Sequence, residues 1–387
     1  MAIPVSYNLR NLIVRKATTL MTAAGIAMTV AVLLAVLGLV AGLESAFKST
    51  GDPLHVLVLR KGGNSELTSL FTPEQFQVAK NFPGIAVGPG GQPLASLEVV
   101  TIVNMPSEQH PDGINITLRG LSQGGVAMRK LKIAQGRWFR PGQREITVGK
   151  NLAKRYPAAQ VGKQLRFGKG LWTIVGVMDG GDSSVNSEIF GDGNQVASDF
   201  NRPDTYSSAL LQAADEVSAA ALKKSLESDR RLNVTVLSER AYYDAQTVSA
   251  APIKFLGFFV CIIMAVGSCF ASMNTMYAAV ARRSKEVGTL RILGFTRGSI
   301  LLSFFLESML LSLFGGLLAC LIVFPLNSVT TSLGNFITFS ETSFKIRIGP
   351  DIMLIGVVVS LILGAIGGLL PARQAAKKEI LTALREV

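Results

Sequence analysis

The stretch IKFLGFFVCIIMAVGSCFASMNTMYAAVARRSKEVGTLRILGF, residues 253–295, joins a long apolar run to a short, strongly charged segment. Within residues 253–281 the only charged side chain is Lys254, at the start of the run. A helix needs about 20 predominantly apolar residues to cross the ~30 Å hydrocarbon core of a membrane. We therefore predict that residues 253–281 cross a membrane and deliver the charged segment, residues 282–298, to one of its surfaces.

Three further runs have this length and composition, and they are residues 17–43, 299–326 and 351–371. Across all 387 residues the mean hydropathy is +0.39, and only 17% of the residues are charged, against roughly 25% in an average soluble protein. The first run is much longer than the apolar region of about 7–15 residues in a secretory signal, so we predict an uncleaved anchor. These runs indicate a membrane protein with four transmembrane α-helices and exclude an average soluble enzyme.

The positive charge of the chain, a net +12, is concentrated in the short segments beside the apolar runs. Lys and Arg side chains in short loops mark the cytoplasmic side of a membrane. The rule places both termini and residues 282–298 in the cytoplasm, and residues 44–252 and the short loop 327–350 outside. Because the cations are divided among membrane edges and form no single patch, we exclude a nucleic-acid partner.

The two ends of the chain differ from the spans in pattern. Residues 1–16 alternate apolar and basic or polar side chains, including Arg10, which indicates an interfacial lead-in helix in contact with membrane lipids. An early start of the first span is the alternative. Residues 372–387 form a basic cytoplasmic tail.

Residues 44–252 are long enough for a folded domain of their own, with two lobes. The sequence of Thr72-Pro73-Glu74 predicts a capped helix that ends before Pro83, and Asp215 to Leu226 reads as a second helix. The β-branched segments predict strands, and they are residues 95–103, 114–121, 144–149, 172–179 and 232–237. Glycine-rich residues 88–91 and 191–194 read as turns. The pattern favours a large α+β extracytoplasmic domain.

No catalytic, cofactor-binding or metal site can be argued from this domain. His55 and His110 are isolated in sequence, and we interpret both as loop or surface residues. The segment from Asp179 to Asp182 resembles a cation loop only loosely and is better interpreted as a turn. The three cysteines all lie inside apolar runs, so no disulfide framework is expected.

Small residues at four-residue spacing in the spans are candidates for close helix packing, although glycine is common in membrane helices in any case. The pairs are Gly38 with Gly42, Gly315 with Ala319, and Gly364 with Gly368. Glu307 is the one acid clearly inside a span. An intramembrane carboxylate is a functional candidate, but one near an interface more often caps or pairs with a loop cation.

The charged segment after residue 281 has the pattern of a short helix. Ser284 is its expected N-cap, Lys285 to Leu293 its body and Gly294 its left-handed end. Apolar side chains between residues 287 and 295 point several ways, which indicates a helix held between its own bundle and another protein. An ordinary positive-inside loop would explain the cations but not these apolar residues.

The segment RRSKEVGTLRILGFTRGSI, residues 282–300, resembles the coupling segment of the MacB/FtsX-like (type VII) ABC transporter permeases. Residues 116–121, 136–139, 144–153, 161–168 and 172–177 resemble the periplasmic core domain of that family in order, and residues 371–387 its tail. The resemblance implies that residues 282–298 dock on a separate ABC ATPase subunit. It assigns this coupling to Arg283, Lys285, Glu286, Val287, Gly288, Leu290, Arg291, Leu293, Gly294 and Phe295.

The resemblance further implies two ATPase copies, a second permease in a homodimer or heterodimer, and a periplasmic adaptor or outer-membrane protein. No G-x-x-x-x-G-K-[ST] motif is present, so we expect ATP and Mg²⁺ to act through the partner and this chain to be no enzyme. The predicted function is that of a bacterial inner-membrane permease that couples ATPase motion to its periplasmic domain and moves a lipid, lipoprotein, hydrophobic compound or peptide. The alternatives are an FtsX-like regulator of a cell-wall hydrolase and a passive membrane-anchored binding protein.

Overall fold

The computed structural model describes residues 10, 14, 16–88, 90–105, 111, 113–335 and 338–377. The chain forms two compact units. The helical unit contains Met1–Ala41, Ala251–Val329 and Ile346–Val387, and the sheet unit contains Gly42–Ala250 and Thr330–Lys345. The predicted lead-in helix, apart from residues 10, 14 and 16, and the end of the predicted tail lie outside the described residues.

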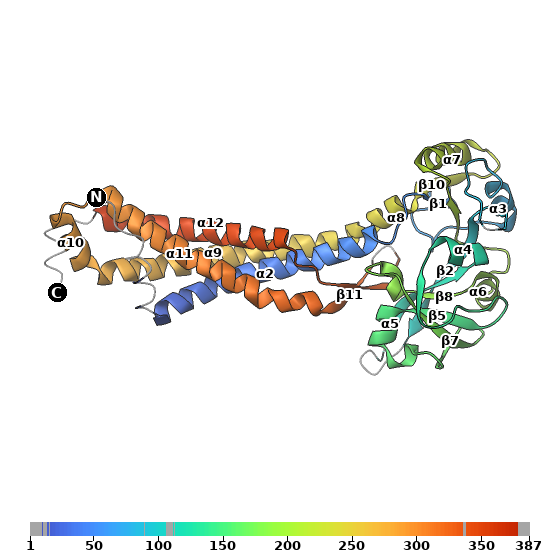
Figure 1. Cartoon of the computed structure of the whole chain (residues 1–387), viewed down its shortest axis with the longest axis horizontal. Coiled ribbons are helices and arrows are strands. Elements are labelled where there is room, and N and C mark those ends of the chain that lie inside the picture. Colours follow the sequence, from blue (N-terminus) through green and yellow to red (C-terminus); the bar gives the residue numbers. More distant parts are fainter. Residues whose placement is uncertain are drawn as a thin grey trace. The chain divides into compact units, whose positions relative to one another are not determined.

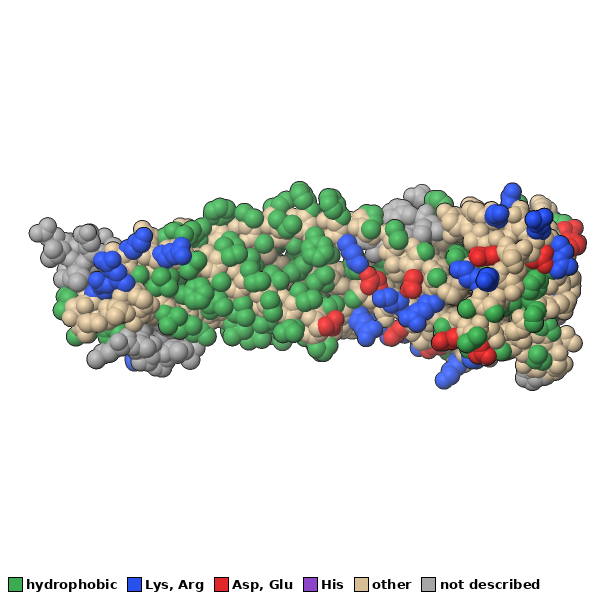
Figure 2. All heavy atoms as spheres, turned by 90° about the horizontal axis from the view of Figure 1, so that it is seen from above, with side chains coloured by type: hydrophobic (Ala, Val, Ile, Leu, Met, Phe, Trp, Pro, Cys, Tyr) green, Lys and Arg blue, Asp and Glu red, His purple; other side chains and the backbone are tan. Residues whose placement is uncertain are grey.

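The helical unit contains four helices that are long and apolar enough to cross a membrane, as predicted (Figure 1). They are α2 (Lys16–Lys48), α9 (Ala251–Arg282), α11 (Arg297–Val323) and α12 (Pro350–Lys377), with the short helix α10 (Ser284–Ile292) between α9 and α11 and the 3-10 turn η4 (Phe324–Ser328) after α11. Helix α12 runs through Pro371 and continues six residues past the predicted end of the fourth span. Figure 2 shows apolar side chains along the visible face of this bundle, and Lys and Arg side chains gathered at its α10 end.

The sheet unit is built on one ten-stranded sheet, in the order β10-β1-β9-β2-β3-β8-β5-β7-β4, with β6 also paired to β7. The β3–β8 and β5–β7 pairs are parallel and the other pairs are antiparallel. The strands are β1 (His55–Arg60), β2 (Ala95–Met105), β3 (Ile114–Leu121), β4 (Lys132–Gly136), β5 (Glu145–Gly149), β6 (Gln164–Phe167), β7 (Gly170–Asp179), β8 (Ile189–Asp192), β9 (Ser208–Gln212) and β10 (Val234–Ser238).

Short helices flank this sheet, as the α+β prediction requires. They are α3 (Pro73–Ala79), α4 (Gln123–Met128), α5 (Lys150–Arg155), α6 (Gly193–Asp199), α7 (Glu216–Ser228) and α8 (Glu239–Gln246), with the 3-10 turns η1 (Pro157–Ala159), η2 (Ser184–Ser187) and η3 (Thr247–Ala250). Thr72 forms the predicted cap of α3, because its side chain accepts from the Gln75 backbone while the Gln75 side chain accepts from Thr72 N–H.

The sheet unit contains two large hydrophobic clusters and a smaller one around Phe190 and Met178. The first is centred on Trp172 and Ile189, the second on Phe71 and Leu222, and Leu97 of β2 packs against both. Hydrogen bonding is continuous across the sheet. The two predicted lobes are therefore two cores on one sheet and not separate domains.

Two local predictions in this unit are wrong. Residues 191–194 do not form a turn between elements, because Gly191 and Asp192 end β8 and Asp192 caps α6 by accepting from Gln195 N–H at 3.1 Å. His55 is not a surface residue, since it starts β1 with 2% of its surface exposed and its Nδ1 lies 2.6 Å from Glu239 Oε2.

The loop between α11 and α12 is more than a short connection. It contains a hairpin of β11 (Thr330–Gly334) and β12 (Glu341–Lys345), and this hairpin belongs to the sheet unit. The chain therefore passes between the two units four times, and each membrane helix continues covalently into the sheet unit.

Candidate functional site

Helix α10 forms the core of the predicted coupling segment, and its ends explain its length. Arg283, not Ser284, is the N-cap residue, and it makes no side-chain cap. At the other end Gly294 N–H donates to Arg291 O and Phe295 N–H donates to Leu290 O, which is the Schellman arrangement. Gly294 has φ +92°, a value that disfavours any residue with a Cβ. The predicted end of the helix at Gly294 is therefore confirmed.

Arg283 joins this segment to α11. Its Nη1 lies 2.8 Å from Glu307 Oε2 and its Nε lies 2.9 Å from Glu286 Oε2. The side chains of Arg283 and Glu307 are 4% and 6% exposed, and the guanidinium also lies over the Phe304 ring at 5.0 Å. Because a buried unpaired charge is costly, this pair fixes the start of α10 against α11. Glu307 thus pairs with a loop cation.

The ten residues assigned to coupling divide into two groups. Arg283, Val287 and Gly288 are buried, and Val287 packs in a cluster with Met276 and Ala375. The exposed or partly exposed members are Lys285, Glu286, Leu290, Arg291, Leu293, Gly294 and Phe295. Ile292, one of the apolar residues of the segment but not among the ten, is 60% exposed beside them. The outward face of α10 therefore carries both charge and apolar surface.

The small residues of the three predicted pairs lie against different parts of the chain. A Cβ on Gly364 or Gly368 of α12 would clash with Ser312 or Ser308 of α11, and Ser308 Oγ donates to Gly364 O at 2.7 Å. A Cβ on Gly315 would lie 3.0 Å from Ala23 O of α2. These small residues allow the close approach of backbones that is common in membrane helices.

Gly38 and Gly42 of α2, in contrast, lie against the strand β12 and the residues that follow it. A Cβ on Gly38 would lie 2.5 Å from Ile348 Cγ1, and one on Gly42 would clash with Lys345 O. Ala319 of α11 is fully buried in the core of the helical unit. The predicted helix contact of Gly38 and Gly42 is replaced by a contact with β12 and the residues that follow it, and the spacing of two glycines could not distinguish the two kinds of contact.

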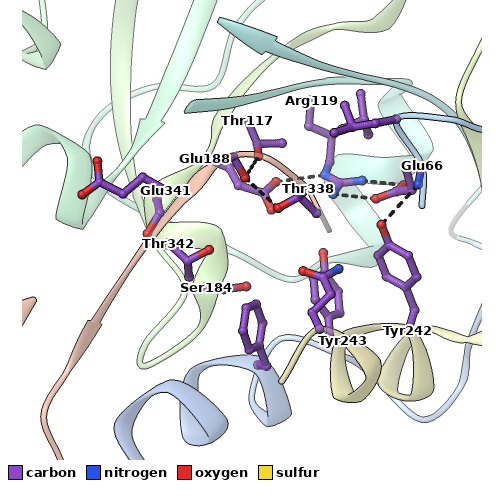
Figure 3. A pocket seen from close by; sticks show the side chains of 16 residues that line it. Glu66, Thr117, Arg119, Ser184, Glu188, Tyr242, Tyr243, Thr338, Glu341 and Thr342 are labelled. Atoms are coloured by element: carbon purple, nitrogen blue, oxygen red, sulfur yellow. Dashed lines mark hydrogen bonds and ion pairs between the residues drawn. The ribbon is translucent and has the colours of Figure 1, made fainter. Parts of the chain in front are cut away.

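Within the sheet unit, the hairpin is held by polar contacts to several elements, among them η2, α5 and β3. Ser343 N–H donates to Ser187 Oγ of η2 at 2.8 Å, and Ser187 Oγ donates back to Ser343 O at 3.3 Å. Arg155 of α5 lies 2.6 Å from Glu341 of β12, and Thr117 of β3 donates to Ser340 at 2.9 Å. Figure 3 shows Thr117, Thr338, Glu341 and Thr342 around one small cavity. These contacts make the hairpin an integral part of the sheet unit.

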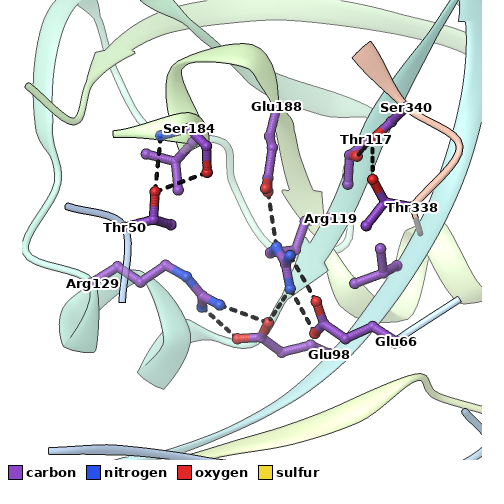
Figure 4. A network of polar contacts seen from close by, with 12 residues as sticks. Thr50, Glu66, Glu98, Thr117, Arg119, Arg129, Ser184, Glu188, Thr338 and Ser340 are labelled. Carbon is purple, nitrogen blue, oxygen red and sulfur yellow. Dashed lines mark hydrogen bonds and ion pairs between the residues drawn. The ribbon is translucent and has the colours of Figure 1, made fainter. Parts of the chain in front are cut away.

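A group of buried charges lies next to this cavity (Figures 3 and 4). Arg119 of β3 pairs with Glu66, Glu98 and Glu188 at 2.8 to 3.0 Å, and Arg129 pairs with Glu98 at 2.5 Å. Burial would raise the pKa of Glu98, but Arg129 and Arg119 outweigh that effect and hold the pKa below its usual value. We call these five residues, with Glu239, which lies 3.8 Å from Arg129, the buried charge cluster.

The cavity itself has a volume of about 20 Å³, which is enough for one water molecule. Burial raises the pKa of Tyr242 and Tyr243, which line it, so both phenols are neutral at physiological pH. No group of three His, Cys, Asp or Glu side chains that could hold a metal is found among the described residues. The cluster connects strands and loops, and its geometry suits a structural role.

The sequence carried a weak signal for the buried charge cluster. Glu98 and Arg119 each interrupt a β-branched strand in which neighbouring side chains are apolar. An acid and a base in two adjacent strands suggest a buried pair, but the partners Glu66 and Glu188 lie in irregular segments without a pattern. The hairpin was hidden for a similar reason, since residues 330–345 are short and polar.

Comparison with known families accounts for most of the chain. Residues 19–229 match the MacB-like periplasmic core domain, and residues 257–380 match the FtsX-like permease C-terminal model. The chain is 27% identical over 351 residues to the uncharacterized ABC transporter permease YknZ of Bacillus subtilis, covering 84% of this chain and 82% of YknZ. It is 22% identical over 318 residues to the macrolide export ATP-binding/permease protein MacB of Hahella chejuensis, covering 76% of this chain and 46% of that protein.

Among solved structures, the periplasmic region of MacB from Actinobacillus actinomycetemcomitans matches 51% of this chain and 94% of its own, at 13% identity and a TM-score of 0.38. The extracellular domain of YknZ matches 47% of this chain and 99% of its own, at 18% identity and a TM-score of 0.37. The family assignment depends on the sequence models, of which the first alone matches more than half of the chain. The order of the two matched regions agrees with a sheet domain between the first and second membrane helices. The chain belongs to the MacB/FtsX-like family of ABC transporter permeases.

Proposed function

We propose that this permease transmits the movement of a separate ATPase subunit to its own sheet unit, and so moves a lipid, lipoprotein, hydrophobic compound or peptide. The chain sits in a bacterial inner membrane with α10 on the cytoplasmic side and the sheet unit on the other. The ATPase supplies ATP and Mg²⁺. Family membership supports the ATPase partner, because permeases of this kind are components of ABC transporters.

The observation that carries the proposal is the Arg283–Glu307 pair. A helix that receives force from a partner must be fixed to the element that it moves and open on the side that the partner contacts. The buried pair fixes the start of α10 to α11, while Glu286 is 56% exposed and Leu293 is 64% exposed. Exposed apolar side chains on a charged helix are typical of a docking surface.

The covalent path from α10 onward supports transmission over the whole chain. Helices α9 and α11 flank α10 directly, and both continue into the sheet unit. Because the β11–β12 hairpin is bonded into that unit through Ser187 and Arg155, displacement of α11 or α12 also acts on the sheet unit. Transmission of this kind requires no polar pore through the bundle.

The test is charge reversal on the exposed side of α10. In Glu286→Lys or Arg291→Glu, we expect the ATPase activity stimulated by the permease to fall by about tenfold, the loss caused by removing one interaction worth about 1.4 kcal/mol. Lys223→Glu, an exposed reversal on α7, is the matched control and should have no effect. Purification of the variant complexes by size exclusion establishes that assembly is retained. Wild-type stimulation in both α10 variants would exclude the coupling role.

A further inference from the structure

Three levels of the contact between helices α11 and α12 place a glycine of one helix against a serine of the other. The pairs are Gly316 with Ser360, Gly364 with Ser312, and Gly368 with Ser308. A Cβ on any of these glycines would clash with the opposite serine Oγ, so each glycine leaves the space that the serine fills. Side chains that interdigitate in this way resist sliding. Helices α11 and α12 therefore form one rigid pair.

Helix α9 also packs against α12, but its polar contacts are incomplete. Ser268 and Ser272 of α9 are 9% and 2% exposed, and neither hydroxyl has a hydrogen-bond partner in the described part of the chain. Between them, Cys269 Sγ donates to Leu363 O of α12 at 3.9 Å. Buried polar atoms usually have a partner, so the two hydroxyls require an explanation.

Pro371 of α12 provides an acceptor for one of these hydroxyls. It lies inside the helix and has no N–H, so the carbonyl of Gly367, four residues earlier, has no helical donor. A Cβ on Gly367 would lie 3.1 Å from Ser272 Oγ. Proline is tolerated in membrane helices where a neighbouring serine or threonine satisfies the carbonyl that it frees. A buried donor without an acceptor thus lies beside a backbone acceptor without its helical donor.

The carbonyls one turn earlier in α12 already accept from neighbouring helices. Leu363 O accepts from Cys269 of α9, and Gly364 O accepts from Ser308 of α11 at 2.7 Å. Ser272 follows Cys269 by about one turn, as Gly367 follows Leu363, so Ser272 continues the same row of contacts. Packed helices commonly shift by about 1–2 Å, and a slide of that size along α12 brings the Ser272 hydroxyl to the Gly367 carbonyl.

The surroundings of α9 permit such a slide. Its outward side chains are not enclosed by the described chain, since Phe255 and Phe270 are 76% and 63% exposed. At its other end α9 leads directly into α10. Arg283 can keep its bond to Glu307 during a shift of this size by changing its side-chain rotamer. A slide of α9 therefore displaces the start of α10 without breaking the buried pair.

We propose that α9 has two positions along the rigid α11–α12 pair, and that a hydrogen bond from Ser272 Oγ to the Gly367 carbonyl holds the second position. In the position that the structure describes, this hydroxyl is unpaired. The two positions are a property of the permease alone. Only their use by an ATPase rests on the proposed function.

The experiment measures one distance by pulsed electron paramagnetic resonance, in the full chain in nanodiscs without nucleotide or ATPase. Spin-labelled amino acids replace Phe255 of α9 and Leu370 of α12, both exposed, so that the three cysteines stay intact. Because Cys269 lies level with Leu363, the labelled positions are about 30 Å apart along the helix axes. A slide of α9 changes this distance directly.

Ser272→Ala removes the donor, and Pro371→Ala supplies a helical N–H to the Gly367 carbonyl while favouring the helix. Both variants abolish the second position, so we expect each to change the mean distance from wild type in the same direction and by the same amount, up to about 2 Å. The double variant should show no further change. Ser312→Ala is the matched control, because its hydroxyl bonds Met309 O in its own helix at 3.0 Å, and it should keep the wild-type distance.

A wild-type distance in Ser272→Ala or in Pro371→Ala would overturn the proposal. So would effects that add in the double variant, because a Ser272 hydroxyl that bonded only its own helix would act independently of Pro371. No ATPase is present in these measurements, so a failure of the proposed coupling role would leave the distances unchanged. The two proposals therefore fail separately.

Discussion

Arg283 at the start of α10 and Glu307 in α11 form a buried ion pair, with Nη1 and Oε2 2.8 Å apart and both side chains more than nine-tenths buried. The pair connects the short helix α10 with the long apolar helix α11 at a point where both charges are largely shielded from water. Together with the packing of Val287 against Met276 and Ala375, it fixes α10 to the bundle.

Replacing Glu307 by Gln should destabilise the helical unit by about 3 kcal/mol, because the Arg283 guanidinium then remains buried with its charge uncompensated on that side. The thermal midpoint of the detergent-solubilised permease measures this loss. Arg283→Met/Glu307→Leu removes both charges and should recover most of the stability while ATPase stimulation stays low. A double variant as unstable as Glu307→Gln would show that the pair does not act by mutual compensation.

Gly294→Ala should weaken the end of α10 by about 1 kcal/mol, since a Cβ at φ +92° is strained and the Schellman bonds depend on that conformation. We expect faster hydrogen exchange in residues 290–296 and reduced ATPase stimulation. Gly298→Ala is the control, because Gly298 lies in the first turn of α11 with its nearest neighbour 3.9 Å from a Cβ. Equal effects of the two substitutions would argue against a special role for the left-handed residue.

Ser187→Ala should release the hairpin from η2. Ser187 Oγ accepts from Ser343 N–H and donates to Ser343 O, so the alanine leaves a buried backbone donor without a partner. Hydrogen exchange in residues 341–345 should accelerate by about tenfold, which corresponds to a loss of roughly 1.4 kcal/mol. The exposed Ser198→Ala on α6 is the matched control. Unchanged protection of β12 would mean that its other contacts hold the hairpin.

Acid should destabilise the sheet unit through Glu98. Its pKa in the folded state lies below the usual value of 4.5, so its ionised form contributes stability above that value, and the contribution is lost as pH falls through the folded pKa. Urea unfolding at several pH values measures the free energy of unfolding. The fluorescence of Trp138 and Trp172 reports on the sheet unit, because both residues lie in it. Glu98→Gln should cost about 3 kcal/mol at pH 7 and flatten the pH dependence below about 4.5.

The exposed Glu216→Gln on α7 should retain the wild-type stability and pH profile. If Glu98→Gln kept the full acid sensitivity, the lost stability would have to come from the other carboxylates whose pKa is lowered. These include Glu145 beside Arg137 and Asp199 beside Arg144.

The elements that the sequence predicted well are those whose formation depends on residues close together in the chain. The four spans follow from apolar length, α3 from the Thr72 cap and its Pro73, and the end of α10 from Gly294. In each case the deciding interactions lie within a few residues along the chain. The boundaries of the elements were predicted less accurately. For example, the N-cap of α10 is Arg283 and not the predicted Ser284.

The sequence by itself determined the membrane class, the order of the domains and the position of the short charged helix between the second and third spans, because hydrophobic length, charge and local caps act over short distances. Tertiary structure alone decided which polar residues are buried and where the hairpin packs. His55 is buried because Glu239, 184 residues away, lies beside it, and the hairpin joins the sheet unit because Ser187 meets Ser343, 156 residues away. Hydrogen bonds between such distant residues depend on how the strands come together, and no local pattern of side chains encodes that arrangement.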